Sequence, residues 1–191
     1  MRPEFVDALE RAGQGEQLTK NDLITLLNAD KDESRTLFEA ADQARANTLG
    51  DEVHFRGIIE FSNHCMKNCL YCGLRRDNKV LARYRLKPEE IIEGARETAR
   101  LGCRTLVLQS GEDSNYSADM LGELIVRIKE ELDLAITLSL GDRTKNDYGL
   151  LKKAGADRYL LKHETCDADL FSYLRPGTCL EERLERQIWL R

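Results

Sequence analysis

From residue 53 onward the chain alternates between short segments with a strand pattern and longer segments with a helix pattern, and this alternation restricts the fold more than any other feature. Strands that follow one another through helices run parallel, because parallel neighbours need a long crossover connection. Pro88 suits the first position of the first crossover helix, and Glu89 and Glu90 suit its positive end. The predicted strands are residues 54–61, 105–109, 135–140 and 158–163.

Parallel strands with helices outside can form an open sheet or a barrel, and the third predicted strand favours the barrel. Its apolar residues Ile136, Leu138 and Leu140 alternate with Thr137 and Ser139, so one face suits helices and the other suits a lumen that holds a ligand. A complete eight-stranded barrel needs about 250 residues. We therefore expect an α/β fold with only about the first half of a TIM-type barrel. The fourth strand would then have an uncovered edge, which predicts a truncated chain.

The first part of the chain carries helix patterns only. We expect a helical extension at residues 1–50, followed by the barrel core at residues 51–191. Thr19 and Asp22 have the spacing of a capping box, which predicts a helix start, and another helix is expected at residues 35–48, with Phe38 on its apolar face. The apolar residues expected to form the buried side of the helix after Thr19 are Leu23, Ile24, Leu26 and Leu27.

Capping boxes also predict two helix starts in the second part of the chain. Thr144 and Asp147 have the required spacing, and Gly155 is typical of the end of that helix. Thr178 and Glu181 have the same spacing after a Pro-Gly turn. We therefore expect a last helix that begins after Thr178 and runs toward the end of the chain.

The composition excludes two classes of partner. The formal net charge is −5, the isoelectric point is about 5.4, and basic residues are interspersed with acidic ones, so neither nucleic acid nor a membrane surface is an expected partner. No stretch approaches the roughly 20 apolar residues of a membrane span, and the first residues lack a signal-peptide pattern, which predicts a cytoplasmic protein. In that reducing compartment we do not expect the six cysteines to form disulfides.

Three of these cysteines fall within eight residues, in the loop after the first strand, where parallel strand-helix folds bind ligands. The C-x3-C-x2-C spacing of Cys65, Cys69 and Cys72 suits three corners of a 4Fe-4S cluster, because thiolates ligate iron-sulfur clusters. The fourth iron would be open to a small molecule with an amine and a carboxylate. Structural zinc, with His54 or His64 or a remote cysteine as fourth ligand, is disfavoured because zinc sites prefer paired motifs. Unmetallated thiols are disfavoured because a polar loop has little core to fill.

The cysteine loop, with Tyr71 before its last cysteine, resembles that of the radical S-adenosylmethionine (radical SAM) superfamily. More closely, the sequence resembles the HydE-type maturases of FeFe-hydrogenase, and it resembles the related methylornithine synthases less. The resemblance covers nearly everything from Asp51 to Arg183 and implies the 4Fe-4S cluster and SAM as cofactors. The matching segments are residues 56–63, 69–78, 108–113, 137–141 and 155–165.

The resemblance also implies roles for side chains that face the cofactors. Tyr71 would pack against the adenine of SAM, and Glu164 would bind the ribose hydroxyls. The Ser110-Gly111-Glu112 turn would receive the methionine ammonium, for which an acid is a suitable partner. Taken alone, that turn is an ordinary end to a strand, and Glu164 could instead cap the next turn.

Two arginines and two further strand residues complete the implied site. Arg175 and Arg183 match residues that the family places around the methionine carboxylate, to which a guanidinium offers paired hydrogen bonds. Taken alone, Arg183 could be a solvated residue of a charged helix. Ser139 resembles a substrate or cofactor contact or else fills the lumen, and Gln109 is a cofactor contact or a satisfied strand-end side chain. The remaining cysteines, read as incidental thiols, are Cys103, Cys166 and Cys179.

The resemblance implies an enzyme that reductively cleaves SAM to a 5′-deoxyadenosyl radical during assembly of the diiron cofactor of FeFe-hydrogenase. The implied substrate is a small molecule or an organometallic iron compound, and the implied partners are the other hydrogenase maturases and an electron donor. The alternatives are a methylornithine synthase-like mutase, a biotin synthase-like enzyme, and a catalytically incomplete fragment that only binds the cluster.

Overall fold

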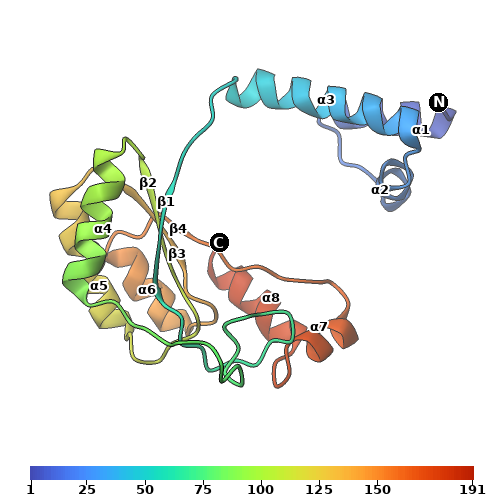
Figure 1. Ribbon diagram of the computed structural model, residues 1–191. Helices are drawn as coiled ribbons and strands as arrows, with labels where there is room; N and C mark the ends of the chain where they lie inside the picture. The colour runs from blue at the N-terminus through green and yellow to red at the C-terminus, as the bar shows by residue number, and fades with distance from the viewer. The chain divides into compact units, whose positions relative to one another are not determined.

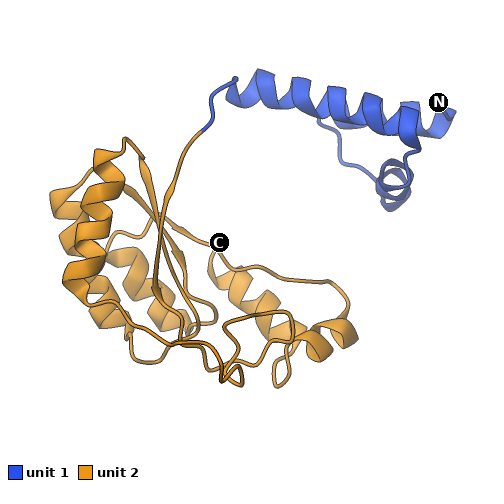
Figure 2. Ribbon diagram, in the orientation of Figure 1, with its two compact units in different colours: residues 1–53 blue, residues 54–191 orange.

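The computed structural model describes residues 1–191, which divide into two compact units, Met1–Val53 and His54–Arg191 (Figure 2). No helix in either unit is both long enough and apolar enough to span a membrane. The helices of the first unit are α1 (Pro3–Gly13), α2 (Lys20–Leu27) and α3 (Lys31–Leu49).

The first unit is held together by ion pairs around a very small apolar core. Phe5 and Ala8 of α1 are fully buried. Arg2, just before α1, donates hydrogen bonds from two guanidinium nitrogens to the buried carboxylate of Glu33, and its Nη2 atom lies 2.7 Å from Oε2. A two-pronged guanidinium contact of this kind fixes the direction of both side chains, so it orients α3 against the start of α1.

The expected burial in the first unit was wrong, although the capping box at the start of α2 is confirmed. Asp22 turns toward α1 and pairs with Arg11, so the side of α2 that carries Asp22 is the buried side. Of the apolar residues of this helix that were expected to be buried, Leu26 is half-buried and the others are exposed. The apolar residues that are exposed instead of buried are Leu23, Ile24, Leu27 and Phe38.

The second unit is built on a four-stranded parallel sheet with strand order β1-β2-β3-β4. Each strand pairs with its predecessor in the chain, and α4, α5 and α6 connect the strands along one face (Figure 1). This is the expected parallel strand-helix architecture. The elements are β1 (Gly57–Ser62), α4 (Pro88–Arg100), β2 (Thr105–Ser110), α5 (Ala118–Glu131), β3 (Ala135–Ser139), α6 (Lys145–Lys153), β4 (Arg158–Tyr159), α7 (Ala168–Leu174) and α8 (Leu180–Trp189).

The main apolar core lies between the sheet and these three crossover helices. Ile136 and Leu138 of β3 are fully buried on the helix side, together with Ile125 and Ile128 of α5. The alternation predicted for this strand is confirmed, since Thr137 lies on the opposite face. Because one face of each strand is committed to this core, the other face is free to carry polar side chains toward the strand ends.

Polar side chains form a row across that opposite face. The register pairs Glu60 of β1 with Gln109 of β2, and Gln109 with Ser139 of β3. The Gln109 amide donates a hydrogen bond to the Glu60 carboxylate at 2.7 Å. Neighbouring strands thus bring these three side chains to one level, and the next residues along each strand lead into the loops of the site described below.

Some predicted boundaries differ from the structure. β1 begins at Gly57, not at residue 54, and β4 has two residues where six were expected. β4 pairs with β3 through only two residues, Arg158 and Tyr159. The last helix expected after Thr178 is present as α8, but the expected cap was wrong: Cys179 is the cap residue, and the Thr178 hydroxyl donates to the Arg175 carbonyl. The Pro88 start and the Thr144 capping box are confirmed.

Candidate functional site

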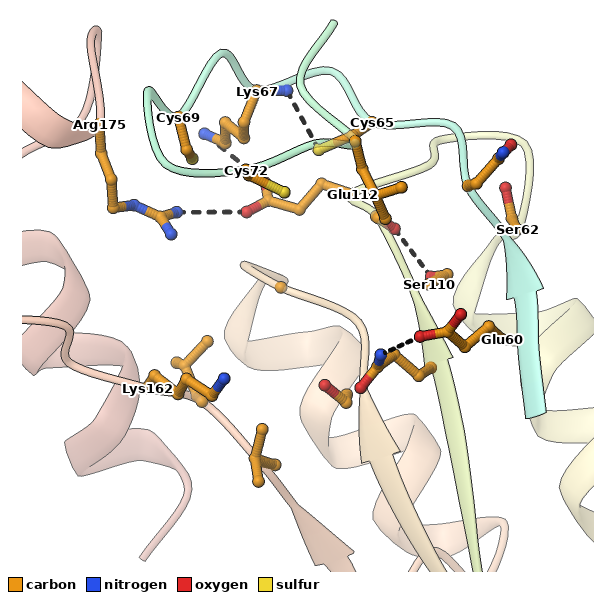
Figure 3. A pocket seen from close by; sticks show the side chains of 18 of the residues that line it. Glu60, Ser62, Cys65, Lys67, Cys69, Cys72, Ser110, Glu112, Lys162 and Arg175 are labelled. Atoms are coloured by element: carbon orange, nitrogen blue, oxygen red, sulfur yellow. Dashed lines mark hydrogen bonds and ion pairs between the residues drawn. The ribbon is translucent and has the colours of Figure 1, made fainter. Parts of the chain in front are cut away.

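A pocket of about 250 Å³ opens at the carboxyl ends of the strands (Figure 3). The ends of β1, β2 and β3 form one wall, the cysteine loop and the turn after β2 form another, and the segment after β4 lines the remaining side together with Arg175 and Arg183. All twelve site residues proposed from the sequence line this one pocket: Cys65, Cys69, Tyr71, Cys72, Gln109, Ser110, Gly111, Glu112, Ser139, Glu164, Arg175 and Arg183.

The three cysteines lie on a loop whose backbone is tied to the rest of the pocket. The Met66 amide donates to the Glu112 carbonyl and the Leu70 amide to the Leu174 carbonyl, both at 2.9 Å. Cys69 is the most buried of the three thiols. Burial raises its pKa, while the positive charge of Arg175 acts to lower it. The loop therefore holds Cys69 at the pocket wall, where burial raises its pKa more than the nearby cation lowers it.

The thiols do not converge on one point. No three Cys, His, Asp or Glu side chains are gathered closely enough to hold a single metal ion. The ligands of an iron-sulfur cluster bind separate irons, so convergence on one point is not required of them. The arrangement is that of three separate thiols around the rim of one pocket.

The two ends of the cysteine loop are fastened by one carboxylate. Asp113 accepts hydrogen bonds from the Ser62 hydroxyl at 2.6 Å and from two nitrogens of Arg85 at 2.7 and 2.9 Å. Ser62 ends β1 before the loop, and Arg85 follows the loop and forms a backbone bridge with Ser62. Inside the loop, the Arg83 guanidinium binds four backbone carbonyls. These belong to Asn63, Leu74, Arg75 and Asn78.

Gly111 lets the cysteine loop approach the end of β2. A Cβ atom at this position would lie 2.2 Å from the His64 carbonyl oxygen and 2.7 Å from the Cβ of Cys65. Real Cβ atoms do not come so close to backbone, so any other residue would push the loop away. The glycine of the Ser110-Gly111-Glu112 turn therefore has a local structural reason.

A cluster of buried charges lies beside the thiols. Arg175 has a side chain only 7% exposed and lies between the carboxylates of Glu112, Asp142 and Glu164, at 3.5, 3.5 and 3.7 Å. It also donates to the Tyr71 hydroxyl at 3.3 Å. Burial raises the pKa of Glu112, and the nearby negative charge of Asp142 raises it further. The guanidinium is therefore shared among several acids, none of which holds it in close contact.

Arg183 is part of the same cluster. Its side chain is 3% exposed, which excludes the solvated role that its helix pattern allowed. It reaches Asp142 at 3.2 Å and the Lys162 carbonyl at 3.2 Å. Lys67 extends the cluster on the other side, with its Nζ atom 3.6 Å from Glu112.

Glu164 has an unusual backbone. Its φ angle of 70° makes it the one residue other than glycine with positive φ. Such a conformation is costly for a side chain with a Cβ atom and is concentrated at functional sites. The backbone thus directs the carboxylate to the rim of the pocket, 3.7 Å from Arg175.

Four pocket residues were missed by the sequence reasoning. Glu60, Lys67, Asp142 and Lys162 all line the pocket or its charge cluster. Glu60 could have been found from strand alternation, because it shares a face with the end of its strand. Asp142 lies three residues after the end of β3, at the ligand side of the sheet, which was the available signal. Lys67 lies between two of the cysteines.

Comparison with known proteins gives the family to which a chain with this fold and this pocket belongs. Residues 59–187 match the family model described as the radical SAM superfamily, and the chain belongs to this family. Among curated proteins it is 48% identical to the [FeFe] hydrogenase maturase subunit HydE of Thermotoga maritima, over 98% of this chain and 53% of that protein. It is 34% identical to the 3-methylornithine synthase of Methanosarcina barkeri, over 95% of this chain and 52% of that protein.

Solved structures show the same fold. The crystal structure of methylornithine synthase PylB superposes with a TM-score of 0.86 at 31% identity, over 96% of this chain and 55% of the other. The crystal structure of HydG, a maturase of the [FeFe]-hydrogenase, superposes with a TM-score of 0.88 at 24% identity, which shows the fold alone. The chain thus spans about half the length of these relatives, and the expectation of a partial radical SAM barrel is confirmed.

Proposed function

We propose that this chain binds a 4Fe-4S cluster through Cys65, Cys69 and Cys72 and binds SAM in the same pocket, as part of an enzyme that acts in assembly of the FeFe-hydrogenase diiron cofactor. The observation that carries the proposal is that all twelve implicated side chains line one pocket. The identity of 48% to a HydE maturase, against 34% to a methylornithine synthase, supports the maturation role over its alternatives.

The residues present fit both groups. Three thiols on one tied loop are the donors that an iron-sulfur cluster takes. The Nε atoms of Arg175 and Arg183 are buried and have no hydrogen-bond partner. Buried donors without a partner are costly, and the carboxylate of an amino-acid ligand would satisfy them.

When bound, the cluster and SAM supply one-electron reductive cleavage of a carbon-sulfur bond, which yields methionine and a 5′-deoxyadenosyl radical. The chain's own residues bind SAM and orient it. Glu112, which faces the cysteine loop, binds the ammonium group of its methionine part. Glu164, at the rim, accepts hydrogen bonds from the ribose hydroxyls. Tyr71 supports the adenine. Along the remaining wall lie Gln109, Ser110, Gly111 and Ser139.

The proposal includes partners. The cluster needs an electron donor, and a maturation role implies work with the other hydrogenase maturases on a small-molecule or organometallic iron substrate. The proposed location is the cytoplasm, where cysteines stay reduced and free to bind iron. The competing assignments are a methylornithine synthase-like mutase, a biotin synthase-like enzyme, and a cluster-binding fragment without activity.

Anaerobic reconstitution tests the cluster. The wild-type chain should take up about four irons, as one 4Fe-4S cluster requires, and the electron paramagnetic resonance spectrum of the reduced cluster should change when SAM is added. Cys69→Ala should abolish iron uptake. Cys103→Ala is the matched control and should leave it intact, because Cys103 lies outside the pocket. Zinc uptake in place of iron would contradict the proposal.

The formation of 5′-deoxyadenosine separates an enzyme from an inactive fragment. Product formed by the 191-residue chain under reducing conditions supports catalysis. If it is formed only by a longer chain that includes this one, the fragment assignment holds. Neither 3-methylornithine nor biotin, the compounds in the names of the competing enzymes, should be formed in either case.

A further inference from the structure

Asp142 occupies a tightly defined place on the loop after β3. Gly141, the residue before it, has a φ angle of 71°, and its carbonyl accepts a hydrogen bond from the Tyr159 hydroxyl at 2.8 Å. A Cβ atom at Gly141 would lie 2.2 Å from the Glu112 side chain. The turn is therefore fixed from both sides, and it directs the Asp142 carboxylate into the charge cluster.

Two guanidinium groups meet on a single oxygen of this carboxylate. The Oδ2 atom of Asp142 lies 3.5 Å from Nη2 of Arg175 and 3.2 Å from Nη2 of Arg183. Arg175 follows α7 and Arg183 belongs to α8, so the contact joins two separate elements. Both arginine side chains are more than nine-tenths buried. Two cations so close together in a buried site repel each other, and an anion between them offsets this repulsion.

No other group serves both arginines. Asp142 is the only carboxylate within 4.0 Å of the Arg183 guanidinium. Arg175 also reaches Glu112 and Glu164, but neither of these contacts Arg183. On its other oxygen, Asp142 faces Arg186 at 3.8 Å, where the pair lacks a close hydrogen bond. Removal of Asp142 would therefore leave Arg183 with a backbone carbonyl as its only partner in the pocket.

We propose that Asp142 is a positioning residue that holds the guanidinium groups of Arg175 and Arg183 side by side, so that both can bind the carboxylate of one amino-acid ligand. The inference rests on the proposed function, in which that ligand is SAM. Asp142 does not touch the ligand in this scheme. It sets the separation of the two arginines, whose Nε atoms remain free to donate.

The test compares two ligands on the anaerobically reconstituted chain by isothermal titration calorimetry. SAM carries the carboxylate, whereas 5′-deoxyadenosine shares only the nucleoside. Asp142→Asn should weaken SAM binding at least tenfold and change 5′-deoxyadenosine binding less than twofold. Asp142→Glu keeps the charge but moves the oxygens by one methylene, so it should restore part of the SAM affinity.

Glu182→Gln is the matched control. Glu182 also pairs with Arg186 on α8, but it is exposed and lies outside the pocket. This variant should bind both ligands like the wild type. Equal weakening of both ligands by Asp142→Asn, or unchanged SAM binding, would overturn the positioning role. If Asp142→Asn does not fold, Asp142→Glu decides alone, through a several-fold loss specific to SAM. A wild-type chain that binds iron but not SAM would overturn the proposed function itself.

Discussion

Replacement of Asp113 by Asn tests the fastening of the cysteine loop. The Asp113 side chain is 3% exposed and accepts hydrogen bonds from Ser62, Arg85 and the Asn115 amide. Because Ser62 and Arg85 lie at opposite ends of the cysteine loop, this carboxylate closes the loop. Asn keeps the shape of the side chain but removes the charge, so the variant isolates the electrostatic part of the closure.

The size of the effect follows from the pKa of Asp113. Burial alone would raise it, but the hydrogen bonds from Arg85 and Ser62 outweigh burial and lower the pKa from 3.8 to about 2. At about 1.36 kcal/mol per unit, this shift corresponds to about 2.4 kcal/mol of folding stability. The pKa is lowered on folding, so this stability is present above pH 4 and is lost as the pH falls toward 2. Arg85 is 38% exposed and can be rehydrated when its partner is lost, which limits the loss to about 2–3 kcal/mol.

Urea denaturation at pH 7 and pH 3 measures this effect. Asp113→Asn should lower the free energy of unfolding by about 2–3 kcal/mol at pH 7, and the gap to the wild type should narrow at pH 3. Asp133→Asn is the control, because Asp133 is exposed and forms no ion pair. Limited proteolysis should also cut the cysteine loop faster in the Asp113 variant. A gap that is constant between the two pH values would refute the reasoning.

Two further predictions concern backbone geometry. Gly111→Ala should force the cysteine loop away from His64 and lower stability by about 1–3 kcal/mol, with reduced iron uptake after reconstitution. Gly149→Ala, at an open position in α6, is its control and should stabilise by up to about 1 kcal/mol, so equal melting temperatures for the two variants would contradict the steric argument. Glu164→Gly relieves the strain of the positive φ angle, so it should raise the free energy of unfolding by about 1 kcal/mol and weaken SAM binding. Calorimetry measures both quantities. Lower stability with unchanged SAM affinity would contradict the idea that the strain is kept for function.

The parts of the fold that sequence could predict depend on short-range patterns. The alternation in β3 separates its core face from Thr137, because strand geometry alone sends neighbouring side chains to opposite faces. The capping box at Thr144 is equally local, since its partners are three residues apart. The parallel order of the strands follows from helical crossovers and needs no knowledge of distant contacts.

The errors arise where a distant partner decides. In α2 the apolar stripe predicted a buried face, but the buried residue is Asp22, which pairs with the distant Arg11, and most of the apolar stripe is exposed. Thr178 had the spacing for a cap, but its hydroxyl donates a hydrogen bond to the carbonyl of Arg175, and Cys179 is the cap residue. Pattern reasoning assigns the best local partner, and tertiary structure can supply a better one.

The site shows the same division at the level of chemistry. The spacing of the three cysteines predicts a cluster loop without any structure, because three thiols so close in sequence must lie near each other in space. Asp142 gave no such signal: its meaning depends on Arg175 and Arg183, which follow it by more than thirty residues, the first just after α7 and the second on α8. A lone acid after a strand is common, whereas one carboxylate oxygen between two buried guanidinium groups is not. The charge balance around Asp142 is therefore a property of the folded chain, and the contrast between SAM and 5′-deoxyadenosine in the Asp142 variants tests the proposed positioning role directly.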